Sequence, residues 1–402
     1  MNPEDFKASP AGHLVPTIQG ALAFVPNPLP PPNLDLAALA NAIEGANHAL
    51  GELSGVGRAL PNPHLLIRPF LRTEAVASSK IEGTVTTFSE LFQLELAGDS
   101  QARSDTKEVR NYSKAMDHGL SRLSSLPISK RLIKELHTVL MDGVTPDRGA
   151  QFQPGEFKTD QNWIGARLLQ NAKFVPPPPK ESEDCLDQLE AYVHNAKNTL
   201  PLAVQLALIH YQFETIHPFP DGNGRIGRLL IPLILCERKW LSQPLLYLSM
   251  FFEQHYTEYV DSMFEVSRVG AWDQWIRFFL RGIEETCNDA TARAKRIQDL
   301  HHTYHQRIQK ARSSALLGKM IDELFNIPAI AIPAAELYLG VSYNSAKKII
   351  GQLVNLGIVA EQKGAKRPKW FFAMEIIAAI HGRQAAIEVK NAPALQPKAD
   401  VS

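Results

Sequence analysis

Apolar residues recur at helical spacing through most of the chain, which predicts a mainly α-helical protein. One helix face is marked by gaps that alternate between four and three residues, at Leu202, Leu206, Ile209, Phe213 and Ile216. A second helical run covers residues 226–236 around Pro232. Between the two, Pro218, Pro220 and Gly222 break the pattern, so we expect a loop that leads directly into the N-terminus of a helix.

The C-terminal region has a pattern of its own. It predicts a helix at 316–325, a short helix at 334–339, a third helix from Ser342 to Leu356, and strand-like segments at 358–361 and 370–372. This order predicts a helix-turn-helix with a β wing. Between Val341 and Trp370, Glu361 is the only acid, against the basic residues Lys347, Lys348, Lys363, Lys366, Arg367 and Lys369. That balance suits DNA, and docking of a protein is an equal alternative.

The loop and helix start at residues 217–228, with the sequence HPFPDGNGRIGR, concentrate a histidine, an acid, three glycines, an asparagine and two arginines. Backbone N–H groups in the first turn of a helix lack intrahelical partners, and the helix dipole is positive there. Gly222, Gly224 and Gly227 let a ligand approach the backbone closely. The segment therefore predicts an anion-binding site.

The ionisable residues of this loop narrow the chemistry. Arg225 and Arg228 oppose the dipole of a merely structural helix, but from one face both can reach the same polyphosphate. Asp221 is a hard oxygen ligand that suits Mg²⁺, and His217 is of the type that serves as a general base. A helix-capping histidine and a DGNG turn are each common, so the combination is what favours a site. It predicts phosphoryl or nucleotidyl transfer to a hydroxyl.

The same twelve residues resemble the signature of Fic-domain proteins, His-x-Phe-x-Asp/Glu-Gly-Asn-Gly-Arg-x-x-Arg, at every defined position. The resemblance implies an all-helical Fic core with a small β-hairpin flap. It also implies transfer of AMP from ATP, with Mg²⁺, to a Ser, Thr or Tyr hydroxyl of a protein target, with release of pyrophosphate. His217 would be the general base, Asp221 the Mg²⁺ ligand and Phe219 a core anchor. The implied nucleotide-binding residues are Gly222, Asn223, Gly224, Arg225, Ile226, Gly227 and Arg228.

Position 224 separates two chemistries within that family. The Doc-type kinases resemble this signature but carry a lysine where this chain has Gly224, and they transfer phosphate. Glycine therefore favours AMP transfer. Arg225 would contact the phosphates near the metal, and Arg228 would hold the γ-phosphate.

The segment from Ser78 to Gly83, with the sequence SSKIEG, is a candidate regulatory element. Taken alone, Ser78 and Glu82 are an i, i+4 pair on a helix that ends at Gly83, an ordinary solvated terminus. Beside the Fic signature it resembles the inhibitory motif Ser/Thr-x-x-x-Glu-Gly/Asn, which implies the self-inhibited class. Glu82 would then bind Arg228 in place of the γ-phosphate. In some relatives this glutamate supports removal of AMP, and the sequence leaves that open.

Two further segments complete the implied site. Residues 157–165 and Phe174-Val175 predict a small hairpin, similar to the flap that pairs with a target's backbone in the family. The last four residues of its first arm would border the nucleotide and the target, with an ordinary surface hairpin as the alternative: Asn162, Trp163, Ile164 and Gly165. Tyr259 resembles an adenine neighbour, although many relatives have a tyrosine pair where this chain has Tyr259-Val260.

A chain of 402 residues exceeds the size of a single hydrophobic core, so several units are expected. The predicted organisation is a flexible Pro-rich lead at 1–33, an N-terminal helical region with the inhibitory helix at 34–102, the Fic catalytic core at 103–288, a connecting helix at 289–313, a winged-helix domain at 314–380 and a disordered tail at 381–402. His301, His302 and His305 fall on the connecting helix, where we expect a solvent-exposed face because no acid or cysteine completes a metal site.

Composition limits the function classes. Lys+Arg and Asp+Glu both total 42, which argues against a nucleic-acid or membrane surface over the whole protein. Cys185, Cys236 and Cys287 are widely spaced and predict reduced, unpaired thiols. The first residues lack a secretory signal, and no apolar run nears the ~20 residues that span a bilayer. The expected location is the cytoplasm, with no membrane partner.

Two functions remain open at this point. The first is a self-inhibited protein adenylyltransferase whose winged helix recruits a protein or DNA. The second is a DNA-binding regulator that senses nucleotide without turnover. An intact His217 favours the first, because sensing alone needs no base. The family resemblance also implies a homodimer.

Overall fold

The computed structural model of the chain describes residues 1–59, 64–84, 86–88, 90–92, 104–144, 153–310, 315–362 and 369–391. In these ranges the fold is mainly helical, as predicted, with one two-stranded and one three-stranded antiparallel sheet. The helices of the central body are α1 (Ala40–Ala59), α2 (His64–Ile81), α4 (Ser104–Arg122), α5 (Lys130–Leu140), α6 (Pro179–Val193), α7 (Leu202–Ile216), α8 (Asn223–Glu237), α9 (Ser249–Gln254) and α10 (Tyr256–Val269).

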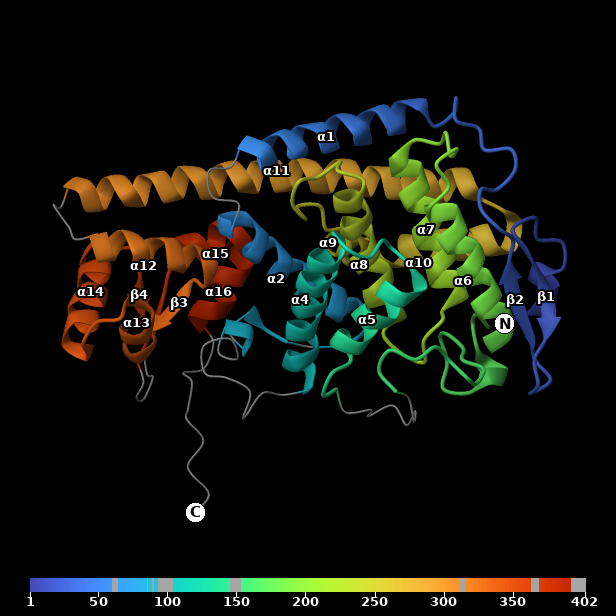
Figure 1. Cartoon of the computed structure of the whole chain (residues 1–402), viewed down its shortest axis with the longest axis horizontal. Helices are drawn as coiled ribbons and strands as arrows, with labels where there is room; N and C mark the ends of the chain where they lie inside the picture. Colours follow the sequence, from blue (N-terminus) through green and yellow to red (C-terminus); the bar gives the residue numbers. More distant parts are fainter. Residues whose placement is uncertain are drawn as a thin grey trace, which may run out of the picture.

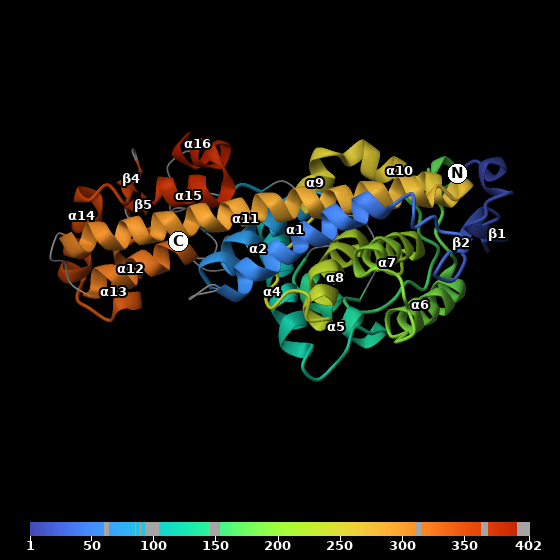
Figure 2. The same ribbon diagram turned by 90° about the horizontal axis from the view of Figure 1, so that it is seen from above.

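A single helix of 39 residues, α11 (Trp272–Lys310), runs along most of the molecule (Figure 1). Helix α1 lies beside it, as the view from above shows (Figure 2). The predicted boundary between the core and the connecting helix at residue 288 falls inside α11. The helix continues because the apolar stripe continues, with Trp275, Ile297 and Tyr304 all fully buried along it.

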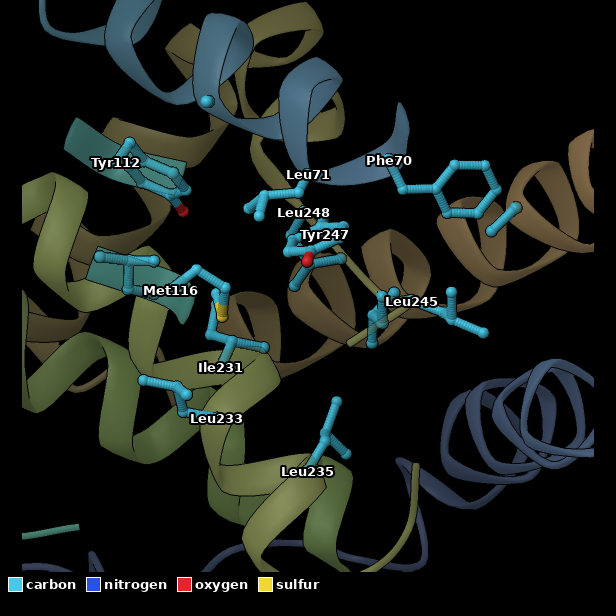
Figure 3. Close-up of a cluster of buried hydrophobic side chains, with 14 of the residues drawn as sticks. Phe70, Leu71, Tyr112, Met116, Ile231, Leu233, Leu235, Leu245, Tyr247 and Leu248 are labelled. Carbon is cyan, nitrogen blue, oxygen red and sulfur yellow. The ribbon is translucent and has the colours of Figure 1, made fainter. Parts of the chain in front are cut away.

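Helix α8 lies at the centre of the body, and thirteen of its fifteen residues are buried. Figure 3 shows the apolar cluster by which α2, α4 and the segment before α9 pack around it. The labelled side chains of this cluster are Phe70, Leu71, Tyr112, Met116, Ile231, Leu233, Leu235, Leu245, Tyr247 and Leu248. The buried carboxylate of Glu74 on α2 adds polar ties, since it accepts hydrogen bonds from the hydroxyls of Tyr112 and Ser249 at 2.8 and 2.5 Å. These contacts fix α2 against α4, the start of α9 and the second half of α8.

The N-terminal segment was predicted to be a flexible lead, and this prediction is wrong for its first 26 residues. After a short 3-10 helix η1 (Pro3–Phe6), strands β1 (Gly12–Pro16) and β2 (Leu22–Pro26) form an antiparallel hairpin. The proline content obscured two aromatic anchors, because Phe6 and Phe24 are both buried and their rings pack on each other at 5.6 Å. The Phe24 N–H also donates to the Val175 carbonyl at 2.9 Å.

The C-terminal unit consists of α12 (Ala315–Asn326), β3 (Ala329–Ala331), α13 (Ile332–Leu339), α14 (Tyr343–Asn355), β4 (Ala360–Glu361), β5 (Trp370–Phe372), α15 (Met374–His381) and α16 (Arg383–Asn391). The strands form an antiparallel sheet in the order β3-β5-β4. Gly340 takes the left-handed turn, with a φ of 64°, and the Ser342 hydroxyl caps α14 as the sequence predicted. Strand β3 was not predicted, because three alanine and isoleucine residues carry no clear alternation.

The tail was predicted to be disordered from residue 381, and this is wrong for its first part. Helix α16 continues to Asn391 and buries Ala385 and Val389 beside Trp370 and Ile377. The polar composition hid this short amphipathic face. The remaining residues of the predicted tail, 392–402, lie outside the described residues.

Two expectations about the whole chain can be compared with the structure. Cys185, Cys236 and Cys287 are free thiols, as predicted. Within the described residues, no helix is both long enough and apolar enough to cross a membrane.

The packing of α2 on α8 predicts a stability cost at their contact. Leu71 is 1% exposed, so Leu71→Ala should lower the free energy of unfolding by about 2–5 kcal/mol through lost burial and a residual cavity. Chemical denaturation followed by circular dichroism measures this change. The control Ile18→Ala removes a fully exposed side chain and should stay within about 0.5 kcal/mol. Equal costs for the two variants would contradict this account of the α2 contact.

Candidate active site

The loop at residues 217–222 joins α7 to α8 and has a residue in the left-handed region at each end. His217 ends α7 with a φ of 48°, and Gly222 precedes α8 with a φ of 80°. The first is uncommon for a residue other than glycine, and it is held from outside the loop. Nζ of Lys158 and Nδ2 of Asn162 both donate to the His217 carbonyl, at 3.0 and 2.9 Å.

The middle of the loop is closed by the Asn223 side chain. Its Oδ1 accepts from the Phe219 N–H at 2.8 Å, and its Nδ2 donates to the Phe219 carbonyl at 2.7 Å. Phe219 itself is fully buried and stacks on the His137 ring with a centroid distance of 3.8 Å. Phe219 thus has the position of a core anchor, and the Asn223 amide is used to shape the loop.

His137 on α5 fixes the end of the loop and was not found from the sequence. Its Nδ1 accepts from the Gly155 N–H at 2.8 Å, so the proton is on Nε2, which donates to the Asp221 carbonyl at 3.0 Å. Burial lowers the pKa of His137 to about 4, so the ring is neutral at neutral pH. A lone histidine on an amphipathic helix gave no signal for this role.

His217 has the protonation pattern that a general base needs. Its Nδ1 lies 3.2 Å from the Glu214 carbonyl, which can only accept, so Nδ1 carries the proton and Nε2 keeps a lone pair. Burial, followed by the charge of Lys158, lowers the pKa of His217 to about 4. The imidazole is therefore neutral and able to take a proton at neutral pH.

Lys158 is a second residue that sequence reasoning did not single out. Its ammonium is buried and donates to the carbonyls of Ile216 and His217 and to Oδ1 of Asn162. Burial lowers its pKa to about 7. Lys158 thereby ties the flap segment to the end of α7 and holds Asn162 in place.

Arg228 is buried in the second turn of α8 and bound by the end of α2. Its Nη2 lies 2.7 Å from Oε1 of Glu82, and its Nε donates to the Ser78 hydroxyl at 2.9 Å. Nη2 also donates to the Ser78 carbonyl at 3.0 Å. Burial alone would raise the pKa of Glu82, but the charge and the hydrogen bond of Arg228, with the charge of Arg225, together outweigh it, and the pKa lies below its ordinary value. Glu82 is therefore ionised on Arg228, the pairing that the sequence predicted.

Gly224 explains why this contact can form. A Cβ at position 224 would lie 2.2 Å from Oε1 of Glu82 and 2.8 Å from Nη1 of Arg228. Both distances are shorter than the contacts that a real Cβ atom makes with a nitrogen or oxygen atom, so a side chain at position 224 would expel the Glu82 carboxylate. Gly83, with a φ of 85°, follows Glu82 in the turn that ends α2.

Arg225 is paired with an acid that the sequence gave no reason to choose. Its Nη1 lies 2.7 Å from Oε2 of Glu108 on α4, and its Nη2 lies 3.5 Å from Oδ1 of Asp221. The hydroxyl of Thr84, the residue directly after the segment 78–83, also donates to Oε2 of Glu108 at 3.1 Å. Glu108 therefore connects the segment after α2 to the first turn of α8.

A cavity of about 200 Å³ brings several of the predicted residues together. Among the residues that line it are Glu82, Ile164, His217, Gly224, Arg228 and Tyr259. Glu214 lines it as well and was not predicted. Burial raises its pKa to about 7, and its buried Oε1 has no hydrogen-bond partner among the residues that the structure describes. A Cβ at Gly227 would lie 2.3 Å from that oxygen, which explains the glycine there.

The predicted flap is less regular than expected. Ile164 and Phe174 form one isolated antiparallel bridge, and the tip between them contains the 3-10 helix η3 (Leu169–Asn171). Gly165 takes a φ of 85° and approaches the Lys173 side chain. The Trp163 indole N–H donates to the Ala166 carbonyl at 3.1 Å. Of the four residues at 162–165 that were predicted to border the nucleotide, only Ile164 lines the cavity.

Tyr259 lies at the edge of the cavity but has its own partner. Its hydroxyl is 2.8 Å from Nε2 of His210, and Nδ1 of His210 is 3.3 Å from the Gly227 carbonyl. Because that carbonyl must accept, Nε2 of His210 accepts from the tyrosine. Tyr259 and His210 thus support the backbone of α8 from behind. Ile226 is buried in the core and does not line the cavity.

Comparisons with known proteins agree with this architecture. The Fic/DOC family N-terminal model matches residues 40–121, and the Fic/DOC family model matches residues 127–235. A crystal structure of a Fic family protein from Desulfovibrio desulfuricans G20 superposes with a TM-score of 0.54 over 86% of this chain and 98% of that chain, at 17% identity. A Fic domain containing signaling protein from Bacteroides thetaiotaomicron VPI-5482 gives 0.51 over 63% of this chain and 97% of that chain, at 20% identity.

Two curated relatives match parts of the chain. The protein adenylyltransferase Fic of Drosophila grimshawi is 30% identical over 160 residues, which are 39% of this chain and 31% of the relative. A probable protein adenylyltransferase of Aquifex aeolicus (strain VF5) is 42% identical over 75 residues, 19% of this chain and 23% of the relative. The chain thus matches less than a third of the length of these relatives. The two family models thus identify a Fic domain at residues 127–235 of this chain, preceded by a Fic/DOC family N-terminal region at residues 40–121.

Proposed function

We propose that this protein is a self-inhibited protein adenylyltransferase. The observation that carries the proposal is the shared cavity, in which the free Nε2 side of His217 and the Arg228 guanidinium face one space that Glu82 enters from α2. The Fic domain and relatives named protein adenylyltransferase support the reaction class.

In the proposed reaction, Nε2 of His217 takes the proton of a Ser, Thr or Tyr hydroxyl on a target protein. The hydroxyl oxygen attacks the α-phosphorus of ATP. The bond from that phosphorus to the oxygen that bridges to the β-phosphate breaks, and pyrophosphate leaves. The N–H groups at the N-terminus of α8, together with Arg228, stabilise the negative charge on the phosphates.

A magnesium ion fits the proposed site through Asp221. The side chain of Asp221 is 28% exposed, and one of its oxygens accepts from the Gly222 N–H at 2.6 Å, so the carboxylate is held at the mouth of the loop. Carboxylate oxygen is the donor that Mg²⁺ prefers, usually together with phosphate oxygens and water. When bound, the ion would neutralise charge on the phosphates of ATP.

Inhibition in this proposal is a competition for Arg228. The γ-phosphate and the Glu82 carboxylate both need the same guanidinium nitrogen, and Glu82 holds it at 2.7 Å. Because Oε1 of Glu82 also lies over the backbone of Gly224, the carboxylate occupies space at the helix N-terminus where phosphates would bind. Release of Glu82 would open both positions together.

A second candidate function is binding of DNA by the C-terminal unit. In its favour, α14 follows α13 through the Gly340 turn, and its side chains Lys347 and Lys348 are exposed. Against it, the ammonium of Lys369 is 2.6 Å from Glu361, which removes one of the positive charges counted in the sequence. Lys363, Lys366 and Arg367 lie outside the described residues. The winged-helix interpretation stays a prediction.

Glu82→Gly should raise AMP transfer by at least about tenfold. Tenfold corresponds to about 1.4 kcal/mol, which is near the lower end of what a hydrogen bond between charged groups contributes. The measurement is covalent labelling of protein in a lysate by ATP with a labelled α-phosphate. Lys80→Gly is the matched control, because it makes the same backbone change in the same turn of α2 and leaves Glu82 in place. A similar increase in both variants would refute inhibition through the carboxylate.

His217→Ala in the Glu82→Gly background should remove at least about 99% of the labelling, since general-base catalysis contributes about 10²–10⁴-fold. Mass spectrometry of the products for a covalent AMP measures it independently. The control His48→Ala replaces an exposed histidine on α1 and should leave labelling unchanged. Retained labelling in the His217 variant would mean that another group is the base.

The DNA alternative predicts salt-dependent binding to a duplex that weakens in Lys347→Ala/Lys348→Ala. If both lysines contact phosphates, the slope of log K against log salt should fall by about 2. Fluorescence anisotropy of a labelled duplex over a salt series measures the slope. Lys7→Ala/Lys114→Ala removes two exposed lysines elsewhere and should not change it. Absence of duplex binding by the full chain would dismiss this function.

A further inference from the structure

Three potential metal-binding side chains converge where the C-terminal unit packs on α11. His301 and His305 lie four residues apart on one face of α11, and Asp322 faces them from α12. The Nε2 atoms of the two histidines lie 2.7 and 3.1 Å from the same oxygen, Oδ1 of Asp322. The sequence prediction that no acid completes a site here is therefore wrong, because the acid comes from the next helix.

We propose that His301, His305 and Asp322 form a Zn²⁺ site. The three ligand atoms all lie within 4.8 Å of one another. In a tetrahedral zinc complex the metal–ligand distances are about 2.0–2.2 Å, which puts ligand atoms roughly 3.4 Å apart. Shifts of rotamer size therefore suffice to let one ion replace the imidazole protons that now face the carboxylate.

The donor set selects the kind of ion. Two imidazoles and one carboxylate suit Zn²⁺, whereas Mg²⁺ and Ca²⁺ prefer oxygen donors throughout and Cu⁺ prefers sulfur. Three protein ligands leave a fourth tetrahedral position, and the side chains of His301, His305 and Asp322 are 25%, 30% and 44% exposed. The fourth position therefore faces solvent and takes a water molecule.

The surroundings give the proposed site a structural role. The His301 ring packs edge-on against Phe325 of α12, with centroids 5.2 Å apart. Between the two histidines, Tyr304 is buried, and its hydroxyl donates to Glu375 of α15 at 2.9 Å. Bound zinc would add a coordinate link between α11 and α12 beside these contacts, and so fasten the C-terminal unit to the long helix.

His302 provides a matched control within the same turn of α11. It points away from the cluster, with its Nε2 2.7 Å from the Gln306 amide, and it is exposed. Replacing it removes an imidazole from the same helix and leaves the three proposed ligands in place.

The test uses the full chain after treatment with a chelator and dialysis against Zn²⁺ alone. Bound metal is counted by elemental mass spectrometry. His301→Ala and His305→Ala should each bind one zinc fewer per chain than the wild type, and His302→Ala should bind as many as the wild type. Using the difference between variants excludes zinc that binds elsewhere in the chain.

Two further readouts keep the result independent of folding defects in the variants. Co²⁺ added to the metal-free wild type should give the visible absorption of a four-coordinate site, and Zn²⁺ should remove it. Zn²⁺ should also raise Tm of the wild type and of His302→Ala, because an ion that binds only the folded state stabilises that state. It should leave Tm of the double variant His301→Ala/His305→Ala unchanged. Equal zinc content in the wild type, His301→Ala, His305→Ala and His302→Ala would overturn the proposal. The lack of a four-coordinate Co²⁺ spectrum in the wild type would overturn it as well.

Discussion

The buried guanidinium of Arg228 is the constraint on which the rest of the site depends. A cation removed from water must be paired, and breaking such a pair by removing one partner is strongly unfavourable. In this conformation Ser78 and Glu82 supply the pairing from α2. The packing of α2 on α4 and α8 is therefore part of the electrostatics of the site (Figure 3). Any ligand that displaces Glu82 must bring its own negative charge to Arg228.

The rest of the site needs no rearrangement for this exchange. His137 holds the backbone of Asp221, and Lys158 with Asn162 holds the backbone of His217. These neighbours are buried or committed to fixed hydrogen bonds, so the base is already oriented while Glu82 is in place. Such preorganisation lowers the cost of reaching the reactive arrangement. In the proposed mechanism, the regulated step is thereby confined to the carboxylate of Glu82.

Helix α11 joins the central body to the C-terminal unit without a break (Figure 2). Its first half buries Trp275 and Phe279 behind Tyr259 and His210, which support α8. Its second half carries the contacts to α12 and α15. A continuous helix transmits position rigidly, so the central body and the C-terminal unit keep a fixed spacing.

The sequence by itself determined what depends on local rules. The helix start after Gly222 and the anion-binding loop before it follow from spacing and backbone chemistry. The pairing of Glu82 with Arg228 was predicted from the resemblance of residues 78–83 to the inhibitory motif of the family, because their spacing alone also fits an ordinary helix end. Tertiary structure decided the pairings between segments far apart in sequence. Glu108 on Arg225 and Asp322 on two histidines have no local signature. Their partners are chosen by how helices pack, and packing depends on the whole core at once.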